Sequence, residues 1–118
     1  MKMKPHLKLE VWKRSVEFVT EIYKLTQSLP ESEKFGLVTQ MRRSAISIPS
    51  NIAEGAGRGG KREFKQFLSI AQGSIAELET QLIISGKLNY AAKDKIDDFI
   101  FELDEISKMI IGLQRSLK

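Results

Sequence analysis

Cysteine is absent from this chain of 118 residues, and histidine occurs only once, as His6. The absence of cysteine excludes disulfides, thiolate metal ligands and a cysteine nucleophile together. With one histidine, the chain has neither a second imidazole for a catalytic triad nor the paired Glu-x-x-His segments of metal-binding helical bundles. Glu54 and Glu77 could face each other, but no imidazole supports them as metal ligands. We therefore predict that the protein is not an enzyme and holds no metal or other cofactor, and we expect no small-molecule substrate.

Long apolar runs are also missing. No segment is apolar enough to span a bilayer, and the basic start of the chain, MKMKPHLKLEVW, lacks the apolar stretch of a secretory signal. We expect no membrane association and, by elimination, a cytoplasmic protein. The length allows one core and is too short for two, which predicts a single domain over residues 1–118. Residues 1–7, with a solvated His6, are expected to form a flexible N-terminus.

What the sequence does have is regular apolar spacing at the helical period. Apolar residues recur at alternating steps of three and four along four segments, which is the pattern of helices packed in a left-handed bundle. The expected helices cover residues 8–27, 30–57, 61–87 and 93–117. The short connections between them predict an all-α, antiparallel, up-down-up-down four-helix bundle.

Proline is scarce, and one of the three prolines, Pro49, falls inside the second of these segments. A proline within a helix removes one backbone hydrogen bond and kinks the helix. A break at Ser47–Pro49 that leaves two shorter helices is the alternative. Because the apolar stripe keeps its phase from Met41 to Ile52, we favour one continuous helix with a kink at Pro49.

Glycine is concentrated between Gly55 and Gly60. The spacing fits G-x-G-x-x-G and most of a phosphate-binding P-loop. Both motifs need a strand before the loop, whereas a helix precedes this one, and Arg62 stands where a P-loop needs Ser or Thr. We interpret the segment as a flexible turn between two helices rather than as a nucleotide site.

Basic residues are unevenly distributed along the chain. Residues 1–62 carry twelve Lys or Arg against six Asp or Glu, whereas residues 63–118 carry seven against nine. Such a polarised particle suits a polyanion or an oppositely charged copy of itself. The basic residues in and around the glycine-rich turn are Arg42, Arg43, Arg58, Lys61, Arg62 and Lys65. Arginine binds phosphate in a bidentate fashion, so we predict that this cluster contacts RNA or DNA backbone. Pairing with acidic residues of a neighbouring subunit is the alternative.

The second predicted helix also carries a polar stripe, made of Arg43, Ser47, Ser50, Asn51, Glu54 and Arg58. These positions fall within about a third of the helix circumference, away from the apolar seam. Ser47, Asn51 and Glu54 differ from the lysines and glutamates of an ordinary solvated face. We therefore predict that they hydrogen-bond something specific, as in an oligomer contact. The alternative partners are groups of the same bundle or of a neighbouring subunit, namely Gln40, Gln81 or Arg43.

Two stretches are specific enough to point to a family. QMRRSAISIPSNIAEG covers Gln40–Gly55, and EF-x-x-FL-x-IA-x-GS-x-x-ELE covers Glu63–Glu79. With their flanks, from Leu7 to Leu113, they resemble the 23S rRNA-intervening sequence protein family, whose founding members are encoded inside intervening sequences of bacterial large-subunit rRNA genes. The arginines at 42, 43 and 58 match the family pattern. The pair at 59 and 60 departs from it, because a Ser or Thr cap is common there and this chain has two glycines.

A similar bundle is the accessory variability protein of diversity-generating retroelements, a ring-shaped homopentamer whose basic surface binds nucleic acid and reverse transcriptase. The resemblance implies a homopentameric bundle that contacts nucleic acid, and it transfers no enzymatic activity. Two hypotheses follow. The first is a non-catalytic, oligomeric nucleic-acid-binding protein; the second is a protein–protein scaffold or accessory subunit with no direct nucleic-acid role.

Overall fold

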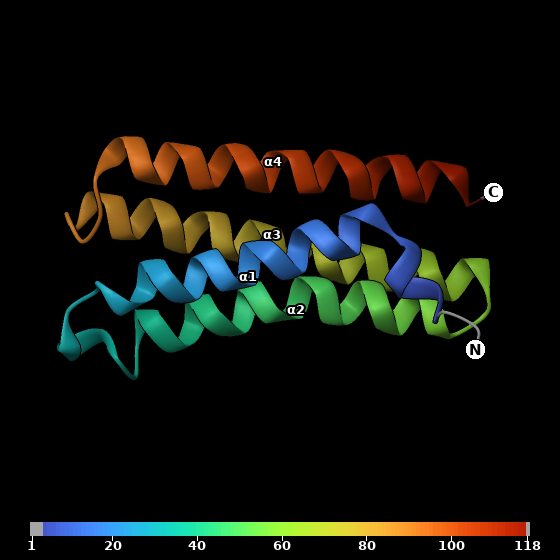
Figure 1. Ribbon diagram of the computed structural model, residues 1–118, viewed down its shortest axis with the longest axis horizontal. Coiled ribbons are helices and arrows are strands. Elements are labelled where there is room, and N and C mark those ends of the chain that lie inside the picture. Colours follow the sequence, from blue (N-terminus) through green and yellow to red (C-terminus); the bar gives the residue numbers. More distant parts are fainter. Residues whose placement is uncertain (1–3, 118) are drawn as a thin grey trace.

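The computed structural model describes residues 4–117, and these residues form four long helices and no strand. The helices are α1 (Glu10–Gln27), α2 (Leu37–Gly57), α3 (Lys61–Lys87) and α4 (Lys93–Ser116). Each helix runs antiparallel to the one before it, so the chain passes up and down along a rod of 43 × 26 × 20 Å (Figure 1). The predicted all-α, up-down-up-down four-helix bundle is confirmed.

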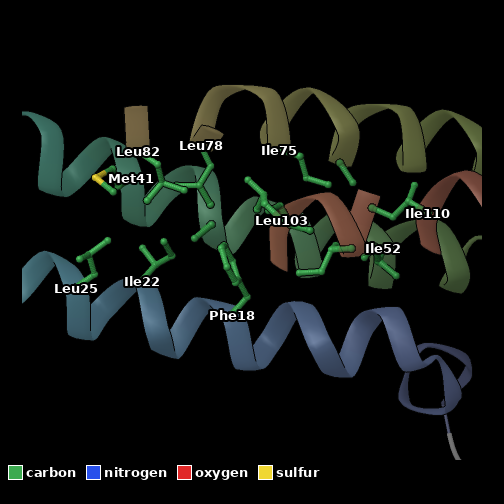
Figure 2. Packing of buried hydrophobic residues seen from close by; sticks show 14 of the residues in the cluster. Phe18, Ile22, Leu25, Met41, Ile52, Ile75, Leu78, Leu82, Leu103 and Ile110 are labelled. Carbon is green, nitrogen blue, oxygen red and sulfur yellow. The ribbon is translucent and has the colours of Figure 1, made fainter. Parts of the chain in front are cut away.

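The core is a continuous apolar column to which every helix contributes (Figure 2). Fully buried members include Ile22 and Leu25 of α1, Met41 and Ile52 of α2, Leu78 and Leu82 of α3, and Leu103 and Ile110 of α4. Burial of one such side chain is worth about 1.5–3 kcal/mol, so this column holds the helices together. Contacts are densest between α2 and α3 and sparse between α1 and α4, which leaves the α1–α4 seam the most open side of the bundle.

The second helix begins at Leu37, seven residues later than the predicted start at residue 30. Pro30 is extended, residues Glu31–Glu33 form a short 3-10 helix (η2), and Gly36 has φ −113° and ψ −106°, outside the helical region. The Glu33 carboxylate then accepts a hydrogen bond from the Leu37 N–H at 3.1 Å. Pro30 therefore opens a separate turn, and this carboxylate satisfies one of the unpaired donors of the true helix start.

The first helix also begins later than predicted, at Glu10 rather than at residue 8. Residues Pro5–Lys8 form a 3-10 helix (η1), and Leu9 is extended, which separates this turn from α1. The His6 ring meets the Trp12 ring edge-on at 4.9 Å between centroids, so His6 packs partly against α1. Residues 1–3 of the expected tail lie outside the described part of the chain, and the flexibility of residues 1–7 stays a prediction.

The remaining boundaries are close to those expected. α2 runs unbroken through Pro49, and α3 begins and ends at the predicted residues. In the α2–α3 turn, Gly59 has a positive φ of 82°, which glycine adopts without steric cost. In the α3–α4 turn, Asn89 has a positive φ of 61°, a conformation that asparagine tolerates better than most residues. Among the described residues, no helix is long and apolar enough to cross a membrane.

Candidate functional site

The basic residues closest to the α2–α3 turn stand on the first two turns of α3. Lys61, Arg62 and Lys65 are all exposed there. Arg62 and Lys65 form no ion pair with any residue in the range 4–117. Cations at a helix N-terminus oppose the helix dipole by about 0.3–1 kcal/mol each. Glu63 in the same turn acts in the favourable direction, as Asp94 does between Lys93 and Lys95 at the start of α4. Lys61 and Arg62 therefore do not themselves stabilise the start of α3.

The α3 N-terminus also lacks a side-chain cap. Its N-cap residue is Gly60, which supplies no side-chain hydrogen bond to the first N–H groups of the helix. These groups have no partner within the helix itself. Gly59 and Gly60 thus leave backbone donors of the first turn beside Lys61, Arg62 and the carboxylate of Glu63.

Arg58 lies on the other side of the turn, at the end of α2, and its charge is shared. Its guanidinium pairs with Glu54 at 3.0 Å and with Glu63 at 3.9 Å, and it lies over the Phe67 ring at 5.2 Å from the centroid. The side chain remains 48% exposed. Arg58 is thus held at the α2–α3 edge and partly neutralised, while its outer face stays open to solvent.

Arg42 and Arg43 are neighbours in sequence, but Arg42 lies on the α1 side of α2 and Arg43 on the α3 side. The Arg42 guanidinium donates to Thr26 Oγ1 at 2.9 Å and to the Tyr23 carbonyl at 3.4 Å, and it stacks on the Tyr23 ring. It thereby joins α2 to the last turns of α1. Arg43 is exposed on the α3 side of α2 and has no ion-pair partner among the described residues. The structure therefore does not bring Arg42 together with the rest of the predicted basic cluster.

The polar stripe of α2 divides into two groups. The Ser47 and Ser74 hydroxyls are hydrogen-bonded at 2.7 Å between α2 and α3, and the Asn51 amide donates to the carbonyl and hydroxyl of Ser47 at 2.8 and 2.9 Å. Glu54 is not part of this network, because it faces solvent and pairs with Arg58. Asn51 is therefore satisfied within its own subunit, by a partner other than Gln40, Gln81 or Arg43.

A polar groove of about 320 Å³ lies between α2 and α3, immediately beside the serine pair. Its lining residues are Gln40, Arg43, Ser44, Ser47, Ser74 and Glu77. Sequence reasoning did not single out Ser44 or Ser74, although both lie at core-facing helical positions where apolar residues are usual. A serine inside an otherwise apolar helical stripe is the signal that could have identified them.

A second groove lies along the open α1–α4 seam, where Phe18 and Phe99 meet edge-on at 5.7 Å between centroids. Its rim carries the carboxylates of Glu17, Glu21, Asp98 and Glu102, with the cations Lys13 and Arg14 at one end. At one point Arg14 bridges the seam, with hydrogen bonds to both carboxylate oxygens of Glu102 at 3.1 and 2.5 Å. This hydrogen bond raises the pKa of Arg14 above its ordinary value, and burial opposes it only in part.

Metal-ligating side chains do not converge in residues 4–117, where no group of three or more His, Asp or Glu residues could hold an ion. Glu54 and Glu77 are also separated, since Glu54 pairs with Arg58 near the turn and Glu77 lines the polar groove beside Ser47 and Ser74. The described side chains thus hold no metal centre at the α2–α3 turn or in the two grooves.

Comparison with known proteins identifies relatives of the whole bundle. The family model described as 23S rRNA-intervening sequence protein matches residues 7–112. A solved structure from Bacteroides thetaiotaomicron, described as a protein of unknown function from the S23 ribosomal protein family, superposes with a TM-score of 0.81. The two chains are 28% identical, and the match covers 88% of this chain and 97% of the other. No curated protein matches the chain.

Proposed function

Because the chain belongs to the 23S rRNA-intervening sequence protein family, we propose that it is a non-catalytic, cytoplasmic homo-oligomer that contacts the backbone of RNA or DNA. The observation that carries the proposal is the exposed basic group at the start of α3, hereafter the basic turn, which consists of Arg58, Lys61, Arg62 and Lys65. Arg62 and Lys65 are exposed without ion pairs inside the described bundle, at an uncapped helix N-terminus. Cations and open backbone donors at one place match the chemistry of phosphate.

The oligomer is proposed as the homopentamer that the family resemblance implies. Several large apolar side chains are exposed on the outer faces of α3 and α4 and near their connection, among them Ile84, Leu88 and Phe101, which is 67% exposed. Exposed apolar side chains that gather on one side of a small protein are typical of contact surfaces. These side chains, rather than the basic turn, are our candidates for contact between copies.

Nucleic-acid binding can be tested through its salt dependence. Fluorescence anisotropy with a labelled RNA duplex and a DNA duplex should show log affinity falling linearly with log salt, by about 0.9 for each phosphate contact on DNA. In the double variant Arg62→Gln/Lys65→Gln, hereafter the basic-turn variant, two contacts are lost. Its slope should be about 2 smaller in magnitude, with weaker binding to every sequence.

The matched control removes the same charge at the opposite end of the rod. The double variant Lys87→Gln/Lys95→Gln changes two exposed cations near the α3–α4 turn, far from the basic turn (Figure 1). This control variant should keep the wild-type slope of log affinity against log salt concentration. Equal slopes for all three proteins, or no binding of either duplex at low salt, would contradict the proposal.

A second candidate function, the protein–protein scaffold, is favoured by the acidic α1–α4 groove. Its aromatic floor and carboxylate rim are complementary to a basic segment of another protein or of another copy. In that case the basic turn of one subunit would pair with the acidic groove of its neighbour. Substitutions on either surface would then change the assembly mass rather than nucleic-acid affinity.

A further inference from the structure

The polar groove between α2 and α3 is lined by a serine hydroxyl that bonds to no described residue. Ser44 is only 6% exposed, yet its hydroxyl forms no hydrogen bond with any other described residue. The other buried hydroxyls are all satisfied: Ser15, Thr26 and Ser85 bond to carbonyls of their own helices, and Ser74 bonds to Ser47. Among the described residues, the buried side-chain atom without a partner is Gln81 Oε1, so the Ser44 oxygen is not sealed in the core but opens into the groove, where it can bond to what enters.

The rims of the groove carry opposite charges that do not neutralise each other. Arg43 stands on α2 and Glu77 on α3, both exposed and both lining the groove. Neither forms an ion pair with the other or with any residue of the described chain. A ligand in the groove would therefore meet a cationic donor on one side, a carboxylate acceptor on the other and the Ser44 hydroxyl in the floor.

The groove volume, about 320 Å³, lies at the small end of the range of roughly 300–1,000 Å³ for ligand pockets. A planar group with acceptors on one edge and donors on the other matches its charges. Guanine has this arrangement, because O6 and N7 accept hydrogen bonds and arginine binds them in a bidentate fashion. Its N1–H and N2 amino groups donate from the Watson–Crick edge, where a carboxylate can accept both. Adenine and uracil each present a hydrogen-bond acceptor on the Watson–Crick edge. The Glu77 carboxylate has no donor for that acceptor, so neither base fits as well as guanine.

The groove and the Arg58 side of the basic turn lie along the same edge of the bundle, whereas Lys65, two turns before Gln72, lies on the α4 side of α3. Arg58 contacts Phe67 of α3, and Ser47 contacts Ser74 of α3, so the α2–α3 edge is continuous from the turn to the groove. Arg43 precedes Arg58 by fifteen residues, which is about 22 Å along α2. A single strand whose phosphates lie on the basic turn can thus place an unpaired base in the groove a few nucleotides away.

We propose that the α2–α3 groove is a seat for an unpaired guanine base, with Arg43 facing its O6 and N7 edge, Glu77 facing its N1 and N2 edge and Ser44 in the floor. This inference rests on the proposed nucleic-acid function and adds base selectivity to it. Unpaired bases are the parts of RNA that proteins read through hydrogen bonds to the base edges. The basic turn holds any strand, and the groove prefers a strand that offers guanine.

The test compares two single-stranded RNAs of equal length and charge, twelve uridines and four repeats of UUG. Wild-type protein should bind the UUG repeat more tightly, by roughly 5- to 150-fold, which is the discrimination of one good bidentate pair. Glu77→Gln should abolish the preference, because the amide presents its own donor to the guanine donors, while the affinity for oligouridine stays within about twofold. Ser44→Ala should reduce the preference.

The matched control is Glu79→Gln, which removes the same charge from the same helix. Glu79 is two turns beyond Gln72, whose amide donates to the Ser107 carbonyl of α4, so position 79 faces α4 rather than the groove. This variant should retain the wild-type preference. In a separate arm, chemical shifts of residues 40–47 and 74–77 should move with guanosine monophosphate, less with inosine monophosphate, which lacks the N2 amino group, and least with adenosine monophosphate.

The outcomes separate this inference from the proposed function. Equal affinity for the two RNAs in the wild-type protein, or a preference that survives Glu77→Gln, overturns the guanine seat and leaves the backbone contact standing. Binding of neither RNA overturns both. A preference that Glu77→Gln abolishes and Glu79→Gln retains supports the seat.

Discussion

At the residue scale, Glu33 shows how one side chain joins two parts of the chain that are distant in sequence. One carboxylate oxygen accepts the Leu37 N–H at the start of α2, and the other accepts the Tyr90 hydroxyl at 3.0 Å from the α3–α4 turn. The sequence indicated that Glu33 stands near a helix start, where a carboxylate is favourable. It gave no sign of Tyr90, because a single pairing across 57 residues leaves no periodic pattern.

The Tyr90–Glu33 bond predicts a pH dependence. The hydrogen bond to Glu33 raises the pKa of Tyr90 above its ordinary value of 10.0, with burial and the carboxylate charge adding to the shift. A folded-state pKa above the unfolded value means that the contribution to stability is fully present below about pH 10 and is lost as pH rises through the folded pKa. The difference in tyrosinate absorbance between wild type and Tyr90→Phe reports Tyr90, and it should titrate above pH 10. Glu33→Gln should lower the midpoint of this titration. A Tyr90 midpoint that Glu33→Gln leaves unchanged would show that the bond does not form.

At the element scale, the helix boundaries predicted from the sequence are correct where residues at the boundary itself signal the start or end of a helix. The bounds of α3 follow from the glycine pair before Lys61 and the loss of apolar spacing after Lys87. The start of α2 was placed wrongly, because Pro30 and the two glutamates that follow it form a good helix-start pattern, and the Gly36 backbone that ends the 3-10 turn has no comparable signal. The polar groove could not be predicted, since it depends on the register between α2 and α3.

The two helices approach each other closely at Gly55, a buried residue of α2. A Cβ atom there would lie 2.8 Å from the Phe67 Cβ and 2.9 Å from a ring carbon of Phe64. Gly55→Ala should therefore push α2 and α3 apart, at a net cost of about 1–2 kcal/mol after the higher helix propensity of alanine is counted. Gly73→Ala is the control, because a Cβ atom there meets nothing within 4 Å and should stabilise α3 by about 0.5–1 kcal/mol.

Urea unfolding of both glycine variants at one fixed protein concentration would measure the difference, since assembly contributes to the stability of an oligomer. The midpoints should move in opposite directions. If both variants were stabilised, the α2–α3 packing at Gly55 would be looser than the structure shows. The hydrogen bond between Ser47 and Ser74, which joins the same two helices, would then also be longer than the structure shows.

At the scale of the whole molecule, the basic turn and the carboxylates of α4 lie far apart along the rod. The basic turn lies where α2 joins α3, and the start of α4 lies at the other end, where Asp94, Asp97 and Asp98 are mixed with Lys93 and Lys95 and Lys93 pairs with Asp97 at 3.4 Å (Figure 1). The rod is 43 Å long, whereas screening at physiological salt acts over about 8 Å. The basic turn and the carboxylates at the start of α4 therefore do not neutralise each other within one subunit, and the basic turn is available to a partner of opposite charge.

That separation makes the assembly mass a test between the two functions. If the basic turn binds nucleic acid, the basic-turn variant should keep the wild-type mass in light scattering and lose RNA affinity. Weakening the acidic groove with Glu17→Gln/Glu21→Gln/Asp98→Asn should then leave the mass unchanged and slightly strengthen RNA binding, because like charges that repel phosphate are removed. If the basic turn pairs instead with the acidic groove of a neighbour, both variants should fall to the mass of one subunit, and raised salt should do the same to the wild-type protein. A fall in mass in both variants would decide for the scaffold, because a surface that joins copies of the chain cannot at the same time be open to a phosphate backbone.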